Sequence, residues 1–226
     1  MAFKYEEVVP WGRSFDEYQR MFGLSNEDLD RVILGCADGP ASFNAEMFRQ
    51  GRRVVSCDPL YQFSSQQIKN RIDATYDQVI GQTKLNREQF IWDRISSPEE
   101  LGRVRLKAMS DFLEDFEQGK QDRRYVTAQL PDLPFASQAF DLALCSHFLF
   151  LYSGSLTLEF HRQAIDELCR VAREVRIFPL LNYNAEPSPF VDAIVDHATR
   201  AGHSVTIEKV PYEFQSNGNK VMRILP

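Results

Sequence analysis

The sequence has few of the features that mark membrane, metal-binding or secreted proteins. It holds no apolar run long enough to span a bilayer, and its first segment, MAFKYEEVVPWGRS, has no apolar core of signal-peptide length. The four cysteines form no CxxC pair, and no histidine flanks them at zinc-ligand spacing. These absences predict a cytoplasmic protein with reduced thiols, no metal site and no membrane partner.

An excess of positive charge is also missing. The 226 residues include 26 Lys and Arg against 32 Asp and Glu, which gives a formal net charge of −6. Because nucleic-acid backbones are bound by clustered Lys and Arg, this balance disfavours nucleic acid as a partner. Two nucleotide motifs are absent as well: G-x-x-x-x-G-K-[ST], which binds ATP or GTP, and G-x-G-x-x-G, which is typical of NAD or FAD sites. The sequence gives no indication of the oligomeric state.

Strands alternate with helices along the chain, and 43% of the residues are hydrophobic, as in ordinary globular domains. Ser14 and Glu17 form a capping-box pattern at the start of a helical segment over 14–30. The elements expected after it are a strand at 31–35, a helix at 40–50 with Pro40 in its first turn, a strand at 53–57, a helical insertion at about 64–122, strands at 124–127 and 140–146, a helix at 156–172, a strand at 174–181, a helix at 189–201, and strands at 204–210 and 220–225. The Asn217-Gly218 pair predicts a hairpin turn between the last two strands.

This order predicts one α/β domain over residues 1–226. It is a doubly wound, mainly parallel sheet with helices on both faces, a helical insertion between strands 2 and 3, and an antiparallel strand in the final hairpin. Ligands of such sheets bind beyond the carboxyl ends of the strands. The first strand ends there in LGCADG, where glycines at 35 and 39 let the backbone approach a ligand closely.

Asp58 ends the second strand, about 20 residues after this turn. A carboxylate at that position can accept hydrogen bonds from both hydroxyls of a ribose. The glycine turn and the acid together therefore predict a nucleotide site. The alternative is that Gly35 and Gly39 only form a tight turn and that Asp58 caps a helix.

The residues at this point resemble the class I S-adenosylmethionine-dependent methyltransferases. LGCADGPASF is similar to their first motif, commonly written LDLGCGTG, and Asp58 matches their acidic residue after strand two. AQLPDLPFASQAFDLALCSHFLFLY is similar to their run around strand four. The resemblance implies a seven-stranded sheet in the order 3-2-1-4-5-7-6 with strand seven antiparallel, and S-adenosyl-L-methionine as the cofactor. The expected activity is methyl transfer to an unidentified acceptor, with a small molecule favoured.

The resemblance also implies which residues hold the cofactor. They are Gly35, Cys36, Ala37 and Gly39 at its methionine and ribose part, Asp58 and Pro59 at its ribose and adenine, Gln129 and Leu130 at the adenine edge, and Cys145 and Ser146 near the transferred methyl. The family's acid on strand one is missing, and our hypothesis is that Asp38, in the turn, replaces it opposite the cofactor's ammonium group. His147 is the candidate general base, because imidazole titrates near neutral pH; the alternative is a histidine bonded to backbone at the pocket wall. Asn182 and Tyr183 are candidates for orienting the substrate, against the alternative that they only form a loop. Trp11, Phe15 and Tyr18 are interpreted as packing residues, against the alternative that they close over the pocket.

The sequence departs from the family pattern in places that bear on activity. Ile33 stands where the family has an acid, Ala37 replaces the middle glycine, and the usual G-G turn before strand five is missing. Two other functions therefore stay open. One is a non-catalytic module that keeps the fold and binds S-adenosylmethionine or a partner, and the other is an NAD-binding protein of related fold.

Overall fold

The computed structural model describes residues 9–226, and residues 1–8, part of the segment tested for a signal peptide, lie outside that range. Its α-helices are α1 (Phe15–Met21), α2 (Asn26–Leu29), α3 (Phe43–Arg49), α4 (Ser65–Leu85), α5 (Pro98–Gln121), α6 (Leu158–Val171) and α7 (Val191–Arg200). Its strands are β1 (Ile33–Cys36), β2 (Val54–Cys57), β3 (Tyr125–Val126), β4 (Leu142–Ser146), β5 (Val175–Phe178), β6 (Ser204–Lys209) and β7 (Lys220–Leu225). Short 3₁₀ helices cover Pro59–Gln62, Arg87–Gln89 and Phe150–Tyr152. Within residues 9–226, each helix is too short or too polar to cross a bilayer.

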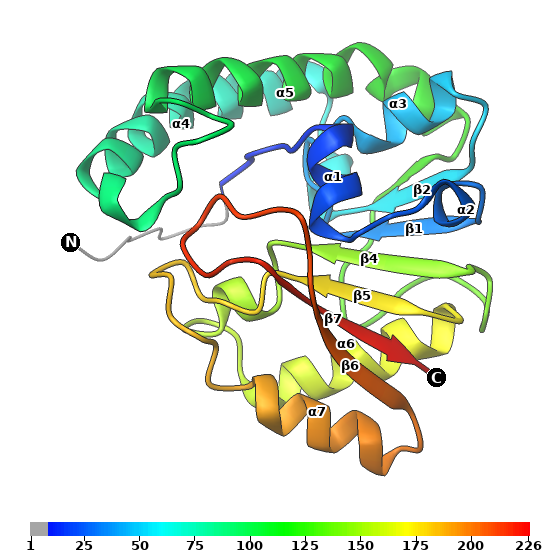
Figure 1. The fold of residues 1–226 in the computed structure, drawn as a ribbon. Coiled ribbons are helices and arrows are strands. Elements are labelled where there is room, and N and C mark those ends of the chain that lie inside the picture. Colours follow the sequence, from blue (N-terminus) through cyan, green and yellow to red (C-terminus); the bar gives the residue numbers. More distant parts are fainter. Residues whose placement is uncertain (1–8) are drawn as a thin grey trace.

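The strands form one seven-stranded sheet in the order β3-β2-β1-β4-β5-β7-β6, which confirms the predicted order. Neighbouring strands from β3 to β5 are parallel, whereas β7 runs antiparallel to both β5 and β6. Figure 1 shows the arrows of β4 and β5 pointing one way and that of β7 the other. The carboxyl ends of the parallel strands therefore meet at one edge of the sheet, which we call the carboxyl edge.

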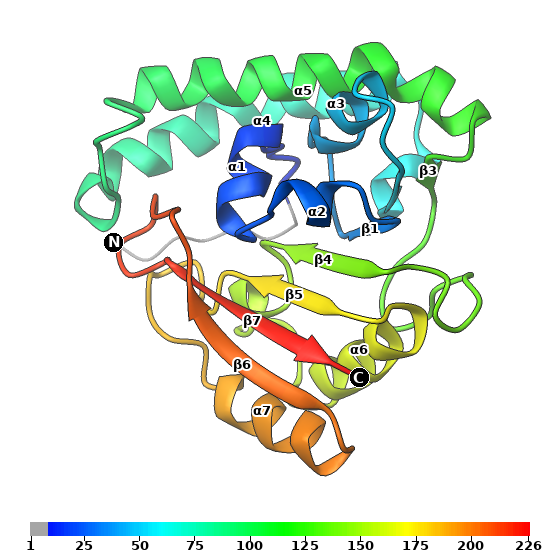
Figure 2. The same ribbon diagram turned by 45° about the vertical axis from the view of Figure 1, so that its right-hand side comes forward.

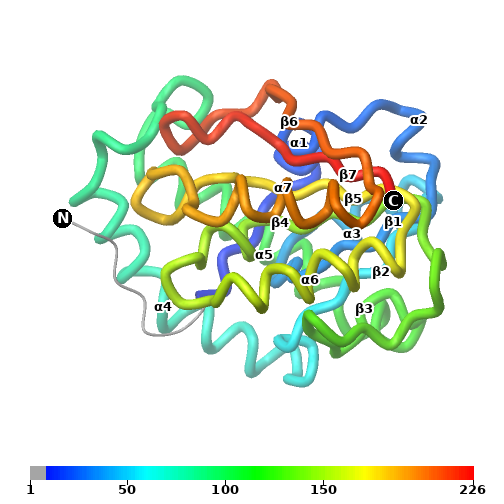
Figure 3. Tube along the Cα trace, turned by 90° about the horizontal axis from the view of Figure 1, so that it is seen from below, coloured from blue at the N-terminus to red at the C-terminus, as the bar shows by residue number. Residues whose placement is uncertain are grey.

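Side chains of the central strands alternate between two hydrophobic cores, as the pleat of a strand requires. Ile33 and Leu142 belong to a cluster with α1 and α3, whereas Leu34 and Ala143 belong to a cluster with α6 and α7. Figure 3 shows α6 and α7 side by side across that second face. Helices therefore cover both faces of the sheet, as predicted.

The expected insertion between β2 and β3 consists of the two long helices α4 and α5. They lie alongside each other beyond the α1 side of the sheet (Figure 2). α5 packs on α3 and on β3. The ring centroids of Phe112 and Phe116 in α5 lie 5.3 and 5.5 Å from that of Tyr125 in β3. The insertion therefore thickens the helical layer on that side of the sheet.

Two local expectations are wrong. The helix expected from residue 40 begins at Phe43 with Ser42 as its N-cap residue, so Pro40 precedes it. The strands β6 and β7 are joined by a longer loop over 210–219, not by a tight turn at Asn217-Gly218.

The backbone of the loop over 210–219 forms hydrogen bonds with the insertion. The N–H of Ile91 donates to the carbonyl of Phe214 at 2.7 Å, and the N–H of Ser216 donates to the carbonyl of Gln89 at 2.8 Å. This loop and the connection between α4 and α5 thus lie together next to the carboxyl edge.

Candidate active site

A cavity of about 900 Å³ opens at the carboxyl edge of the sheet. Its walls come from the segments after β1, β2, β3, β4 and β5, the segment before α1, the helices α4 and α5, and the 210–219 loop. Most of the residues predicted from sequence lie in these walls: Cys36, Ala37, Asp38, Gly39, Asp58, Pro59, Gln129, Leu130, Ser146, His147 and Tyr183. The fold therefore brings segments far apart in the sequence around one cavity.

Asp38, in the turn after β1, is a nearly buried carboxylate that two hydroxyls hold in place. Tyr18 donates to its Oδ1 at 2.8 Å, and Ser56 donates to its Oδ2 at 2.6 Å. Burial raises the pKa of Asp38 to about 6, although the hydrogen bonds from Ser56 and Tyr18 act in the opposite direction. Tyr18, interpreted from sequence as a packing residue, is thus also a hydrogen-bond donor in the cavity wall.

Gly35 was expected at the methionine and ribose part of the cofactor, but it does not line the cavity. A Cβ at this position would lie 1.8 Å from Oδ2 of Asp38, so only glycine leaves room for that carboxylate. Ala37 replaces the middle glycine of the family pattern, yet its φ of 57° is in the left-handed region that glycine favours. The turn thus keeps a glycine-like backbone at position 37, and Gly35 acts on the site through Asp38.

Asp58 caps a 3₁₀ helix, which is one of the two roles that sequence analysis left as alternatives. Its Oδ2 accepts the N–H of Gly39 at 2.9 Å, and its Oδ1 accepts the N–H of Leu60 at 2.8 Å, which caps the 3₁₀ helix. Each carboxylate oxygen keeps a second lone pair for a ligand in the cavity that Asp58 lines. Burial raises the pKa of Asp58, against the effect of these two N–H groups.

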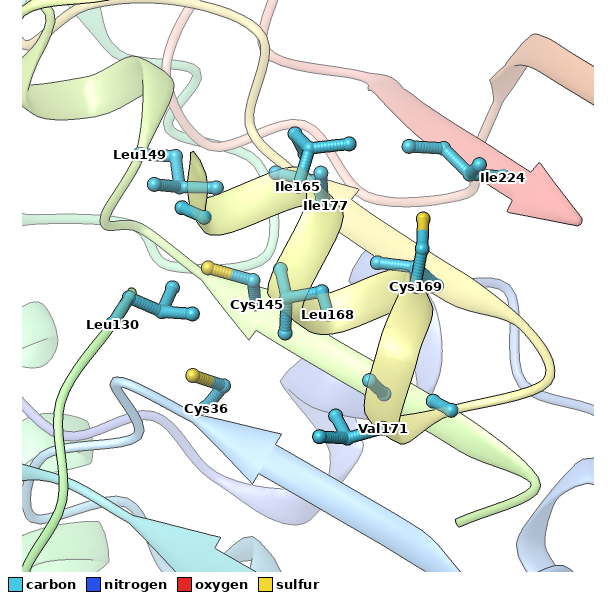
Figure 4. Close-up of a cluster of buried hydrophobic side chains, with 14 of the residues drawn as sticks. Cys36, Leu130, Cys145, Leu149, Ile165, Leu168, Cys169, Val171, Ile177 and Ile224 are labelled. Atoms are coloured by element: carbon cyan, nitrogen blue, oxygen red, sulfur yellow. The ribbon is translucent and has the colours of Figure 1, made fainter. Parts of the chain in front are cut away.

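Cys145 was expected near the cofactor, but it lies in the core. It is fully buried in the cluster beneath α6, near Leu168 (Figure 4), and it is not part of the cavity wall. Its neighbour Ser146 does line the cavity.

Asn182 likewise lies outside the cavity wall, where it stabilises its own loop. Its Oδ1 accepts the N–H groups of Asn184 and Glu186 at 2.9 and 3.2 Å. Its neighbour Tyr183 does line the cavity, and its ring lies 6.2 Å from that of Tyr152. The polar run after β5 therefore contributes an aromatic side chain, not an amide, to the site.

His147 lines the cavity with a φ of 50°, and its backbone N–H donates to the carbonyl of Phe178 at 2.6 Å. Its Nδ1 lies 2.9 Å from the hydroxyl oxygen of Ser146. Burial lowers the pKa of His147 well below its usual value, and the positive charges of Arg13 and Arg105 lower it further. The expected titration near neutral pH is therefore not met, and the imidazole is neutral at pH 7.

A cluster of buried charges in the cavity wall was not foreseen from the sequence. Arg105 of α5, only 1% exposed, forms an ion pair with Glu17 of α1, and the hydroxyl of Tyr212 donates to Glu17 at 3.1 Å. One signal was present: Arg105 follows Leu101 and precedes Met109 by one helical turn, so all three share the buried face of α5. Arg13 lies in the same wall.

The strand order with an antiparallel β7, and the cavity at its carboxyl edge, define the fold as that of the class I methyltransferases. The chain is 34% identical over 223 residues to uncharacterized protein MJ0045 of Methanocaldococcus jannaschii. The aligned region covers 97% of this chain and 96% of that protein. The chain belongs to the same family as that protein. No protein-family model matches the sequence.

Solved structures show a more distant likeness. A SAM dependent methyltransferase from Aquifex aeolicus matches with a TM-score of 0.43 and 13% identity, over 93% of this chain and 87% of that one. Magnesium protoporphyrin IX methyltransferase (ChlM) from Synechocystis PCC 6803, solved with bound SAM, matches with a TM-score of 0.44 and 11% identity, over 93% of this chain and 90% of the other.

Proposed function

We propose that this protein is an S-adenosylmethionine-dependent methyltransferase that acts on a small molecule. The observation that carries the proposal is the meeting of Asp38, Gly39 and Asp58 in one cavity at the carboxyl edge. When bound, S-adenosylmethionine supplies a sulfonium methyl; a nucleophile of the acceptor bonds to the methyl carbon, and the electron pair of the broken C–S bond stays on sulfur.

The residues in the wall fit the parts of this cofactor. Asp58 has free lone pairs for two ribose hydroxyls, and the Asp38 carboxylate offers a negative charge to an ammonium group. Gln129 and Leu130 provide an amide and an apolar surface for a flat base. A volume of about 900 Å³ lies near the upper end of the ~300–1,000 Å³ typical of ligand pockets, which leaves room for an acceptor as well.

His147 is our candidate for contact with the acceptor. As a neutral imidazole it can accept a hydrogen bond or a proton from the acceptor, although its lowered pKa makes it a weak base. In the variant His147→Ala, we expect S-adenosylhomocysteine to bind as in the wild type and methyl transfer to slow by about 100-fold or more. Unchanged turnover would remove His147 from the mechanism.

Titration calorimetry tests the cofactor assignment directly. We expect S-adenosylmethionine and S-adenosylhomocysteine to bind the folded protein, and NAD to bind at least tenfold more weakly, because G-x-G-x-x-G is absent. Absence of binding by either sulfur ligand would refute the proposal. A preference for NAD would favour the related nicotinamide-binding function instead.

The pH dependence of binding tests the role of Asp38. Because its pKa is about 6, Asp38 is mostly protonated at pH 5 and mostly ionised at pH 7. Only the ionised form pairs with the ligand's ammonium, so S-adenosylhomocysteine affinity is expected to rise about tenfold over this range. The variant Asp38→Asn should bind more weakly at pH 7 and lose most of this slope. The same slope in wild type and variant would exclude an Asp38–ammonium pair.

A further inference from the structure

Several aromatic side chains that line the cavity take no part in the cofactor contacts proposed above. We call six of them the aromatic wall: Trp11, Phe148, Tyr152, Tyr183, Tyr212 and Phe214. They come from the segment before α1, from the loops after β4 and β5, and from the 210–219 loop. Rings presented from separate segments around one cavity suit a flat, apolar molecule.

Arg13 stands in the same cavity wall without an acidic partner. Its Nη1 donates to the backbone carbonyl of Trp11 at 2.7 Å, and its Nε has no acceptor although it is shielded from solvent. In the part of the chain from residue 9 to 226, no carboxylate forms an ion pair with it. A guanidinium in the cavity wall, with a shielded Nε and no carboxylate partner, favours an anionic ligand.

Glu17, the nearby acid, is already fully engaged. It accepts the N–H and the hydroxyl of Ser14 at 3.0 and 3.1 Å, the hydroxyl of Tyr212 at 3.1 Å, and the guanidinium of Arg105. The group of Arg13, Arg105 and Glu17 therefore carries one net positive charge. That charge acts on the cavity, since both arginines lower the pKa of His147.

We propose that the methyl acceptor is a flat, apolar small molecule with an acidic group, such as a carboxylate, which binds to Arg13 while the aromatic wall covers its ring. The proposal rests on the methyltransferase function proposed above and names the substrate class for that site. A carboxylate also occurs in the amino-acid part of the cofactor, so the experiment must separate these two sources of negative charge. The planar fork of arginine suits a carboxylate from either source.

Two fluorescent probes of similar shape test the proposal. 8-Anilinonaphthalene-1-sulfonate carries a negative charge, and N-phenyl-1-naphthylamine does not. Both are titrated against wild type, Arg13→Gln, Arg13→Lys and the control Arg103→Gln, whose arginine is exposed on α5 outside the cavity wall. A urea unfolding curve for each variant shows that it is folded.

In Arg13→Gln, we expect the anionic probe to bind about 10- to 100-fold more weakly and the neutral probe to change less than about twofold. Arg13→Lys keeps the charge and should recover part of the affinity, while Arg103→Gln should match the wild type. An equal loss for both probes would show a merely structural role for Arg13 and overturn the proposal. So would an unchanged affinity for the anionic probe.

Binding of S-adenosylhomocysteine and of 5′-methylthioadenosine, which lacks the amino-acid part, separates the cofactor from the acceptor. We expect Arg13→Gln to change neither by more than about threefold. If it weakens only S-adenosylhomocysteine and leaves the anionic probe unaffected, Arg13 binds the cofactor's carboxylate, and the acceptor proposal is wrong. If wild type binds neither adenosine ligand yet keeps the Arg13-dependent probe preference, the methyltransferase function fails while the acid-binding site stands.

Discussion

Replacing Glu17 with alanine is expected to lower the free energy of unfolding by about 3–5 kcal/mol. The substitution would leave the guanidinium of Arg105, which is 1% exposed, buried without its counter-ion. It would also remove the acceptor for Tyr212 and half of the capping box that Ser14 forms with Glu17. Urea unfolding followed by circular dichroism measures the change.

Two further variants distinguish the effect of breaking the buried Glu17–Arg105 pair on stability from the effect of removing any carboxylate. Glu46→Ala removes an exposed ion pair with Arg49 and should cost less than about 1 kcal/mol. A Glu17→Leu, Arg105→Met double variant replaces both charges with apolar side chains and should recover most of the lost stability. If Glu17→Ala and Glu46→Ala are equally stable, the buried pair of Glu17 and Arg105 contributes no more to the free energy of unfolding than an exposed pair does.

The same pair makes stability sensitive to acid. Burial alone would raise the pKa of Glu17, but the charge and hydrogen bond of Arg105 outweigh it and lower the pKa from 4.5 to about 2. A carboxyl whose pKa is lower in the folded state stabilises the fold above the unfolded-state value, and this stabilisation is lost as pH falls through the folded value. The contribution of Glu17 is therefore expected to be complete above about pH 4.5 and to disappear toward pH 2.

The capping box illustrates what the sequence could and could not reveal. The pattern of Ser14 and Glu17 predicts a helix start from neighbours three residues apart, and the structure confirms it. That same carboxylate also binds Arg105, which lies 88 residues away. Local patterns carry no information on such a contact, and arginine is rarely found buried, so the ion pair could not be predicted.

The doubly wound sheet and its carboxyl edge could be predicted because strands alternate with helices along the chain. The order of the strands was implied by the resemblance to the class I methyltransferases. Which side chains line the cavity could not be predicted in the same way. Cys145 and Ser146 follow each other at the end of β4, yet only Ser146 lines the cavity, and no local sequence pattern indicates which of the two does. The Asn217-Gly218 pair has the composition of a tight turn, yet the 210–219 loop pairs with an insertion more than a hundred residues earlier.

Replacing Asp58 with alanine is expected to weaken S-adenosylhomocysteine binding by at least about 100-fold. The estimate follows from losing two hydrogen bonds to a charged acceptor, each contributing roughly 1.5–3 kcal/mol. Asp58 has lone pairs free for this contact and lies in the cavity wall. Calorimetry measures the loss, and Asp73→Ala on the exposed side of α4 is the control.

The variant alone leaves two explanations, because Asp58 also holds the N–H groups of Gly39 and Leu60. Changing the ligand instead of the protein separates them. If Asp58 binds the ribose, wild type should prefer adenosine to 2′-deoxyadenosine by about tenfold, and Asp58→Ala should lose that preference. If Asp58 only holds the turn, the variant weakens both nucleosides equally and the preference persists. That result would contradict a ribose contact while leaving the cavity and its other contacts in place.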